Sequence, residues 1–132
     1  GSRINSKFGR RVRVFNMRVL ISIMFAATIT MPAHAELIKV EEQIDFVEIV
    51  SGKTLTLPFI KINVSPNGKI EGRGARWDVE GTWFWKEGYF CRDLFWGGDP
   101  LGYNCQEVAA NGKRIQFTSD RGAGRSATFR LR

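Results

Sequence analysis

The chain has 132 residues, enough for one domain, with 20 lysines and arginines, 13 acidic residues and a formal net charge of +7. The charge is unevenly distributed, because six basic residues and no acidic residue lie before residue 19, whereas residues 36–132 hold 14 basic and 13 acidic residues. The positive excess therefore belongs to the N-terminal segment. The rest of the chain gives no overall electrostatic reason to expect a nucleic-acid partner.

Residues 17–35 have the three-part pattern of a cleavable secretory signal peptide. Arg18 provides a positive start, residues 19–31 form an apolar run interrupted only by Ser and Thr, and Ala33-His34-Ala35 offers small residues for cleavage. At about 1.5 Å per residue this run is too short for a ~30 Å hydrocarbon core, so no membrane span is expected after cleavage. We expect residues 1–16 to be a tag and upstream extension. Residues 36–132 are expected to form one domain that is periplasmic or secreted.

Residues 41–50 have apolar side chains at helical spacing, with acidic residues towards the start and Gly52 placed as a stop. This pattern predicts one short amphipathic helix near the N-terminus of the mature domain. We interpret its apolar side as a cover for the end of a sheet or barrel.

The rest of the chain predicts about eight short strands, since apolar and polar residues alternate between turn sequences such as Asn67-Gly68 and Asn111-Gly112. Turns or loops are also expected at 86–88, 97–102 and 120–124. The strands are expected at residues 54–57, 60–64, 70–73, 77–85, 89–96, 103–109, 114–118 and 126–132. Short links force antiparallel neighbours, which favours a small up-and-down, lipocalin-like β-barrel. A partly open sheet with the helix across its open side is the alternative.

Two cysteines, Cys91 and Cys105, lie in the mature domain, and an exported chain with an even cysteine count favours a disulfide. The bond would join neighbouring strands and close a loop of about 15 residues, worth roughly 3 kcal/mol. His34, the single histidine, lies in the leader, so no His–Cys zinc site and no histidine-dependent catalytic site is expected after cleavage. We expect no metal, no cofactor and no enzymatic activity. Asp78 and Glu80 are interpreted as solvated surface.

Aromatic residues crowd residues 77–96, which contain all four tryptophans. A ring cluster with a nearby guanidinium often holds a carbohydrate or a small aromatic ligand, so Trp83, Trp85, Trp96 and Arg92 are candidate ligand-binding residues. The alternative is that the rings fill the interior of a small barrel. Outward-facing Phe84 and Trp96 would instead favour a protein partner.

The glycine-rich segment 120–125 has two arginines, Arg121 and Arg125, among small residues. Its backbone N–H groups and the two guanidiniums are a candidate site for a carboxylate or phosphate. An ordinary hairpin loop without a ligand is the alternative.

Four short motifs are spread over the mature domain: residues 77–83 (WDVEGTW), 88–92 (GYFCR), 103–106 (YNCQ) and 120–124 (DRGAG). Together they resemble a family of small exported bacterial proteins that often carry the label dihydrodipicolinate reductase. The enzymatic label does not transfer, because the chain lacks the cofactor motif, the histidines and the length of a cytoplasmic Rossmann-fold reductase. The resemblance implies an exported, barrel-like protein of unassigned role.

These observations lead to one expectation about function. The mature domain is expected to be an exported, non-enzymatic binding or inhibitory module for an unidentified small ligand or protein partner. A structural or interaction subunit of an envelope complex is the alternative.

Overall fold

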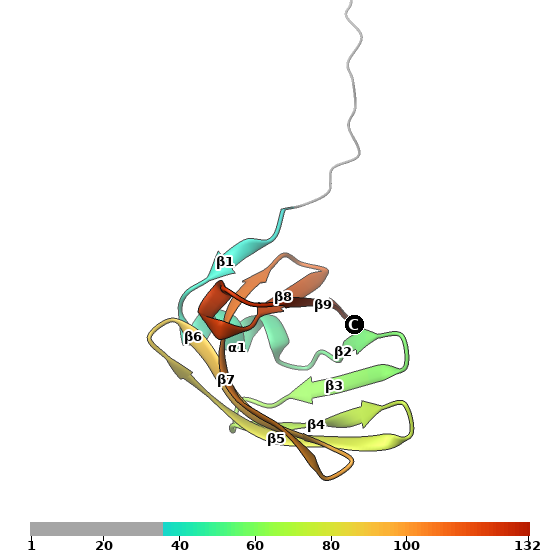
Figure 1. Cartoon of the computed structure of the whole chain (residues 1–132). Helices are drawn as coiled ribbons and strands as arrows, with labels where there is room; N and C mark the ends of the chain where they lie inside the picture. The colour runs from blue at the N-terminus through green and yellow to red at the C-terminus, as the bar shows by residue number, and fades with distance from the viewer. Residues whose placement is uncertain (1–35) are drawn as a thin grey trace, which may run out of the picture. The chain divides into compact units, whose positions relative to one another are not determined.

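The computed structural model describes residues 36–132, so the predictions for the leader and for the segment before it lie outside the described residues. The described part holds one α-helix, one 3₁₀ turn and nine strands (Figure 1). In chain order they are β1 (Ile38–Val40), α1 (Gln43–Val50), β2 (Leu55–Leu57), β3 (Ile60–Val64), β4 (Lys69–Gly74), β5 (Trp77–Lys86), β6 (Tyr89–Trp96), β7 (Asp99–Ala110), β8 (Arg114–Thr118), η2 (Asp120–Gly122) and β9 (Ser126–Leu131).

Strands β2 to β9 form a closed antiparallel barrel. Each strand pairs with the next in the chain, and β9 also pairs with β2, which leaves no gap in the ring. The predicted eight-stranded up-and-down barrel is therefore confirmed, and the open-sheet alternative is not adopted. A ninth strand, β1, was not predicted; it pairs with the last residues of β7, from Val108 to Ala110.

Side-chain alternation divides every strand between the barrel interior and the outer surface. On β5, Val79, Gly81, Trp83 and Trp85 alternate with outward-facing polar residues and Phe84, as the sequence pattern indicated. Gly81 is required at its position, because a Cβ there would meet the backbone carbonyl of Asp93 on β6.

The turn between β6 and β7 is shorter than predicted. The expected loop over 97–102 is wrong, because β7 begins at Asp99 and Gly97-Gly98 alone make the turn, with φ of 59° and 89°. The ladder register shifts beyond Leu94, where Leu101 is left without a paired residue. A bulge of this kind lets the hairpin extend past the predicted boundary.

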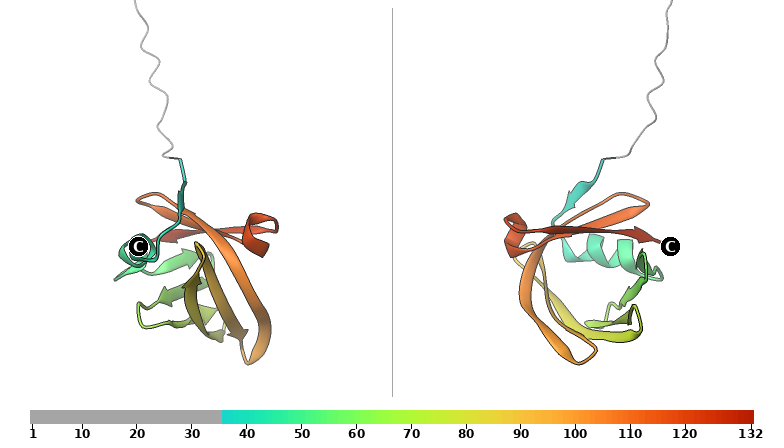
Figure 2. Two further views of the ribbon diagram at one scale, coloured as in Figure 1. Left: turned by 90° about the vertical axis from the view of Figure 1, so that its left-hand side faces the viewer. Right: turned by 45° about the vertical axis from the view of Figure 1, so that its right-hand side comes forward.

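Helix α1 occupies one side of the barrel interior, as Figure 2 shows, and its start at Gln43 is two residues later than expected. Phe46 is fully buried, and its ring centre lies 5.0–6.4 Å from those of four aromatic side chains on the strands: Trp83, Trp85, Phe90 and Phe117. The predicted role of the helix as a cover is confirmed by this shared core.

The described residues, 36–132, belong to one compact unit that contains every strand of the barrel and its hydrophobic core. Within the described residues, no helix has the length and apolar character that crossing a membrane requires.

Candidate functional site

A cavity of about 340 Å³ lies inside the barrel, lined by residues from all its strands except β5. Its walls are mainly apolar. The apolar lining residues are Leu55, Ile62, Val64, Ile70, Phe90, Leu94, Phe117, Ala127 and Phe129. They are the inward-facing members of each strand's alternation, so the pattern that builds the core also builds the cavity wall. Part of the barrel interior is therefore occupied by α1, while another part remains hollow.

Five polar residues complete the cavity wall: Arg92, Gln106, Ser119, Arg125 and Ser126. Gln106 is 7% exposed, and its side-chain Nε2 donates a hydrogen bond to the Ser119 hydroxyl at 3.1 Å. Among the described residues, the Gln106 Oε1 atom accepts no hydrogen bond from the protein. A few polar groups in a mainly apolar cavity are typical of small-molecule sites.

Arg92 lies on β6 between Phe90 and Leu94, which also line the cavity, so its side chain is on the interior side of the strand. Its Nη1 donates to the backbone carbonyl of Gly102 at 2.6 Å. Desolvation by burial lowers the pKa of the Arg92 guanidinium from its ordinary value, and the Coulombic effect of Asp93 partly opposes this. A guanidinium has five N–H donors, so one bond leaves most of its donor capacity for a ligand.

The structure separates the two arginines of the glycine-rich segment. Arg125 lines the cavity, whereas the Arg121 guanidinium lies over the ring of Tyr89, 5.3 Å from its centre, and 4.0 Å from a Glu87 carboxylate oxygen. Arg121 does not line the cavity, so this cavity does not bring the two candidate residues together. Within this segment the N–H groups of Gly122, Ala123 and Gly124 donate to carbonyls of Ser119 and Asp120, so the turn itself uses them.

The three tryptophans predicted to bind a ligand do not line the cavity. Trp83 is 5% exposed, and each indole N–H donates to a backbone carbonyl: Trp83 to Ser65 at 2.8 Å, Trp85 to Glu41 at 3.0 Å and Trp96 to Gly74 at 3.1 Å. The alternative considered from the sequence, that these rings fill the interior, describes Trp83 and Trp85, which pack on Phe46. Of the six candidate ligand residues, the cavity brings together only Arg92 and Arg125.

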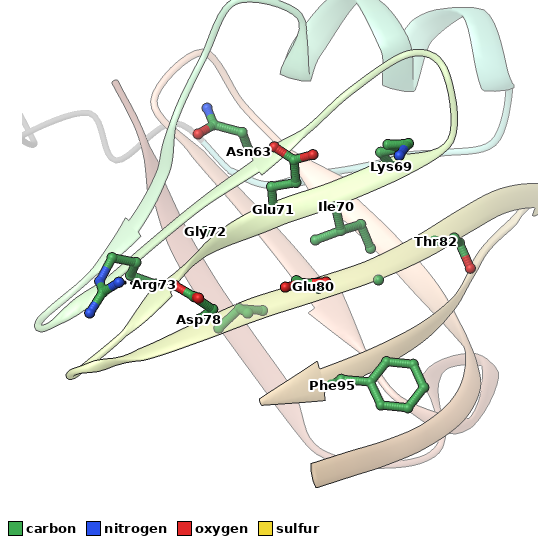
Figure 3. A pocket seen from close by; sticks show the side chains of 12 residues that line it. Asn63, Lys69, Ile70, Glu71, Gly72, Arg73, Asp78, Glu80, Thr82 and Phe95 are labelled. Atoms are coloured by element: carbon green, nitrogen blue, oxygen red, sulfur yellow. Dashed lines mark hydrogen bonds and ion pairs between the residues drawn. The ribbon is translucent and has the colours of Figure 1, made fainter. Parts of the chain in front are cut away.

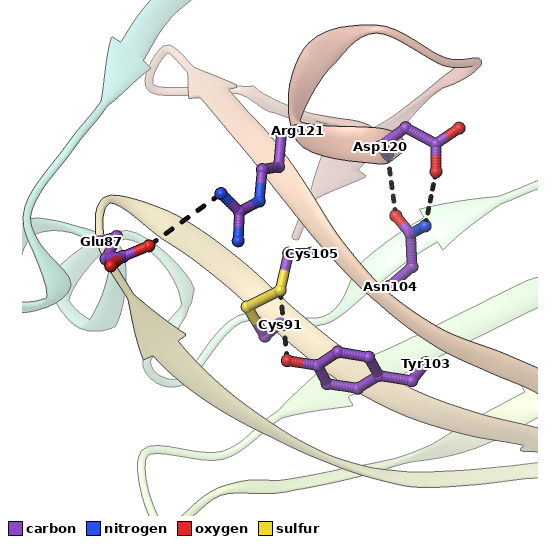
Figure 4. The surroundings of a disulfide bond; sticks show 7 residues. All are labelled: Glu87, Cys91, Tyr103, Asn104, Cys105, Asp120 and Arg121. Carbon is purple, nitrogen blue, oxygen red and sulfur yellow. Dashed lines mark hydrogen bonds and ion pairs between the residues drawn. A yellow bond between two sulfur atoms is a disulfide. The ribbon is translucent and has the colours of Figure 1, made fainter.

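The disulfide joins Cys91 on β6 to Cys105 on β7, which are paired in the ladder with Cα atoms 3.9 Å apart. The predicted bond between neighbouring strands is confirmed. Figure 4 shows that it lies beneath the η2 segment, beside Tyr103, whose hydroxyl is 3.3 Å from the Cys105 sulfur. The side chain of Asn104 exchanges hydrogen bonds with the backbone N–H and the carboxylate of Asp120, which holds η2 against β7 (Figure 4).

A second hollow, of about 760 Å³, lies over β4 and β5 and is much more polar (Figure 3). Glu71 and Glu80 are paired across the two strands here, and Arg73 forms a 2.9 Å ion pair with Asp78. All four side chains point outward from their strands and are exposed to solvent. This arrangement agrees with the interpretation of Asp78 and Glu80 as surface residues.

The sequence did not identify Gln106 and Ser119 as site residues. Gln106 follows Cys105 and lies on the inner face of β7. Pairing β7 with β6 through the two cysteines would have placed Gln106 opposite Phe90 and so indicated this position. Ser119 has no such signal, because it lies beyond the end of β8 and depends on the path of the following turn.

Among residues 36–132, no group of three or more His, Cys, Asp and Glu side chains is placed to hold a metal ion. Comparisons of the chain with protein-family models, curated proteins and solved structures find no match.

Proposed function

We propose that the mature domain is an exported, non-enzymatic binding module whose barrel cavity holds a small amphiphilic molecule. The apolar part of the ligand lies among the inward-facing aliphatic and aromatic residues, and its anionic group lies near Arg92 and Arg125. The observation that carries the proposal is the joint placement of two arginines and a buried Gln106 in the wall of one mainly apolar cavity.

The chemistry of the lining supports an anion rather than a neutral polar group. Among residues 36–132, no carboxylate side chain lines this cavity, whereas two arginines do. Partial burial of Arg92 without an anionic neighbour in the cavity is unfavourable, as the lowered pKa of its guanidinium indicates. A carboxylate, sulfonate or phosphate of a bound ligand would offset that desolvation through charge-assisted hydrogen bonds.

The size of the cavity also supports a small ligand. Its volume of about 340 Å³ lies at the lower end of the range for small-molecule sites. Because the site is interior, a projecting loop of the kind that protein inhibitors use is not needed to explain it. The expected export and the resemblance to small exported proteins fit a carrier or sensor of this type.

The proposal is tested with two fluorescent probes that share one ring system, 1-anilinonaphthalene-8-sulfonate and its uncharged analogue N-phenyl-1-naphthylamine. We expect saturable binding of the sulfonate and weaker binding of the neutral probe, because only the sulfonate can pair with the guanidiniums. Residues 36–132 with the disulfide intact are titrated, and competition by straight-chain fatty acids then measures the preferred length.

Two substitutions and a matched control make the test specific. Arg125→Gln should weaken sulfonate binding about tenfold and leave the neutral probe unchanged, since a hydrogen bond to a charged group contributes about 1.5–3 kcal/mol. Arg114→Gln removes a cation on the outer face and should change neither affinity. Equal affinity for both probes, or equal losses in both variants, would contradict a site at Arg125.

A second candidate function rests on a different observation. Four large apolar side chains are 40–56% exposed on the outer face of β5, β6 and β7: Phe84, Phe95, Leu101 and Tyr103. Phe84 and Tyr103 stack with ring centres 6.1 Å apart. This face supports the interaction-subunit alternative, although Trp96 packs against Gly74. Chemical crosslinking in envelope extracts that is abolished by Tyr103→Ser would favour it over the cavity.

A further inference from the structure

A row of basic residues crosses four neighbouring strands on the outer surface of the barrel. Arg114 on β8 is paired with Arg130 on β9, Arg130 is next to Thr56 on β2, and Thr56 is paired with Lys61 on β3. With strands about 4.8 Å apart, the row extends roughly 14 Å. In Figure 1 these strands follow one another on the side of the barrel that carries the C-terminus.

The row lies in a hollow of the outer surface, of about 1030 Å³, which Lys113 and Arg132 also line. All five basic residues are exposed, and no acidic side chain in the described part of the chain lines this hollow. The ion pairs in the described part of the chain, Arg73–Asp78 and Arg121–Glu87, involve none of the five. This patch, here called the basic face, therefore carries uncompensated charge.

The basic face has an energetic cost for folding. Arg114 and Arg130 are directly opposite each other across a strand pair, an arrangement that destabilises a sheet. An anionic partner would offset this repulsion by attracting both guanidiniums.

An exposed aromatic residue stands at the edge of the basic face. Phe59 forms the turn between β2 and β3, two residues before Lys61, and its side chain is 87% exposed. Its φ of 65° lies in the left-handed region, which is unfavourable for a bulky residue. A hydrogen bond from the Ala75 N–H to the Phe59 carbonyl, at 2.7 Å, holds this turn against the turn between β4 and β5. Leu57 and Pro58, on the same hairpin, line the hollow beside the row.

We propose that the basic face docks on an anionic phospholipid surface, with Phe59 entering the boundary between headgroups and acyl chains. Lysine and arginine side chains contact lipid phosphates, while an aromatic ring at the end of a turn gains by leaving water. A nucleic acid fits less well, because stacking of successive bases requires several aromatic platforms along the charged groove, and none of the described residues that line the hollow is aromatic. The expected export of the domain also places it beside a membrane surface.

The test measures co-sedimentation of residues 36–132, disulfide intact, with vesicles of phosphatidylglycerol and phosphatidylcholine in equal parts, and with vesicles of phosphatidylcholine alone. We expect binding to the anionic vesicles that weakens as salt rises, because screening shortens the range of the attraction. Each cation near an anionic surface contributes a factor of about five to the partition coefficient. The triple variant Lys61→Gln, Arg114→Gln, Arg130→Gln should therefore bind roughly a hundredfold more weakly.

A matched control removes the same charge elsewhere. Lys39, Lys69 and Lys86 are exposed and do not line the hollow of the basic face, so their triple change to Gln should alter binding only a few-fold. Phe59→Asn should weaken binding about tenfold, and Asn tolerates the left-handed turn, so the fold is kept. Circular dichroism and melting temperature confirm folding of each variant, and the basic-face variant should retain its affinity for the sulfonate probe.

The proposal is overturned by an absence of binding to anionic vesicles or by equal losses in the two triple variants. Unchanged vesicle binding by Phe59→Asn would overturn the insertion of the turn. Competition with a mixed-sequence oligonucleotide addresses the other polyanion: if the oligonucleotide binds through the basic face and the vesicles do not, the occupant is a nucleic acid and the membrane assignment is wrong.

Discussion

Replacing Phe46 with alanine should destabilise the domain more than any other single substitution in α1. The side chain is fully buried, and its ring lies within 5.2 Å, centre to centre, of three other rings, those of Trp83, Trp85 and Phe90. Removing a buried Phe side chain loses transfer free energy and leaves a void, which together cost about 3–5 kcal/mol. For a domain of this size, each kcal/mol lowers the melting temperature by roughly 4–8 °C.

The assay is urea unfolding of residues 36–132 followed by tryptophan fluorescence, with the disulfide intact. Ile44→Ala provides a control on the same helix, because Ile44 is 72% exposed and its loss should change the free energy of unfolding by less than about 0.5 kcal/mol. If Phe46→Ala does not fold, Phe46→Leu should show a smaller loss in the same direction. A loss below about 1 kcal/mol for Phe46→Ala would refute the conclusion that α1 is part of the core.

Three further outcomes are expected. Reduction of Cys91–Cys105 should lower the free energy of unfolding by roughly 3 kcal/mol in the chain-entropy model, measured by urea titration with and without reductant; an unchanged midpoint would show that the bond contributes nothing. Gly81→Ala should lower the melting temperature or prevent folding, because its Cβ would meet the Asp93 carbonyl, and a normal melting temperature would show that β5 and β6 can separate there. Trp85→Phe should cost about 1 kcal/mol by removing one hydrogen bond to the chain before α1, and faster amide exchange at the start of the helix should accompany it.

The barrel could be predicted from the sequence because its determinants are local. Period-two alternation marks the strands, and Asn-Gly and Glu-Gly pairs mark their turns, as at Gly68 and Gly88 with φ of 92° and 86°. Antiparallel pairing of successive strands then follows from the short links. The pairing of Cys91 with Cys105 was equally accessible, since both lie on one hairpin.

The cavity and the basic face depend on contacts that are distant in the sequence. Arg92 and Arg125 line one cavity only because β6 and the segment that leads into β9 face the same interior. The basic row joins Lys61 to Arg114 and Arg130, residues whose neighbours in the sequence give no sign of clustered charge. A net charge near zero for residues 36–132 therefore did not exclude a strongly charged surface.

The tryptophans show a different limit. An aromatic cluster such as Trp83 and Trp85 is expected both in a ligand site and in a hydrophobic core. Only the position of α1 distinguishes these two roles. A short amphipathic segment predicts a helix, but the residues of its apolar face do not indicate which aromatic side chains the helix will contact. The arrangement of Phe46 among those rings is a property of the closed barrel as a whole.

The cavity and the basic face lie on opposite sides of strand β9 and are separated only by its backbone. Ala127 and Phe129 line the cavity, while Arg130 lies on the basic face. A slip of one residue would exchange these sides, placing a guanidinium among aliphatic side chains and an aromatic ring in water. Thr54 and Arg132 prevent such a slip through two reciprocal backbone hydrogen bonds of 2.9 and 3.0 Å. The register of β9 is thus fixed at Arg132, directly after its last residue, and insertion or deletion of one residue within the strand would alter both surfaces at once.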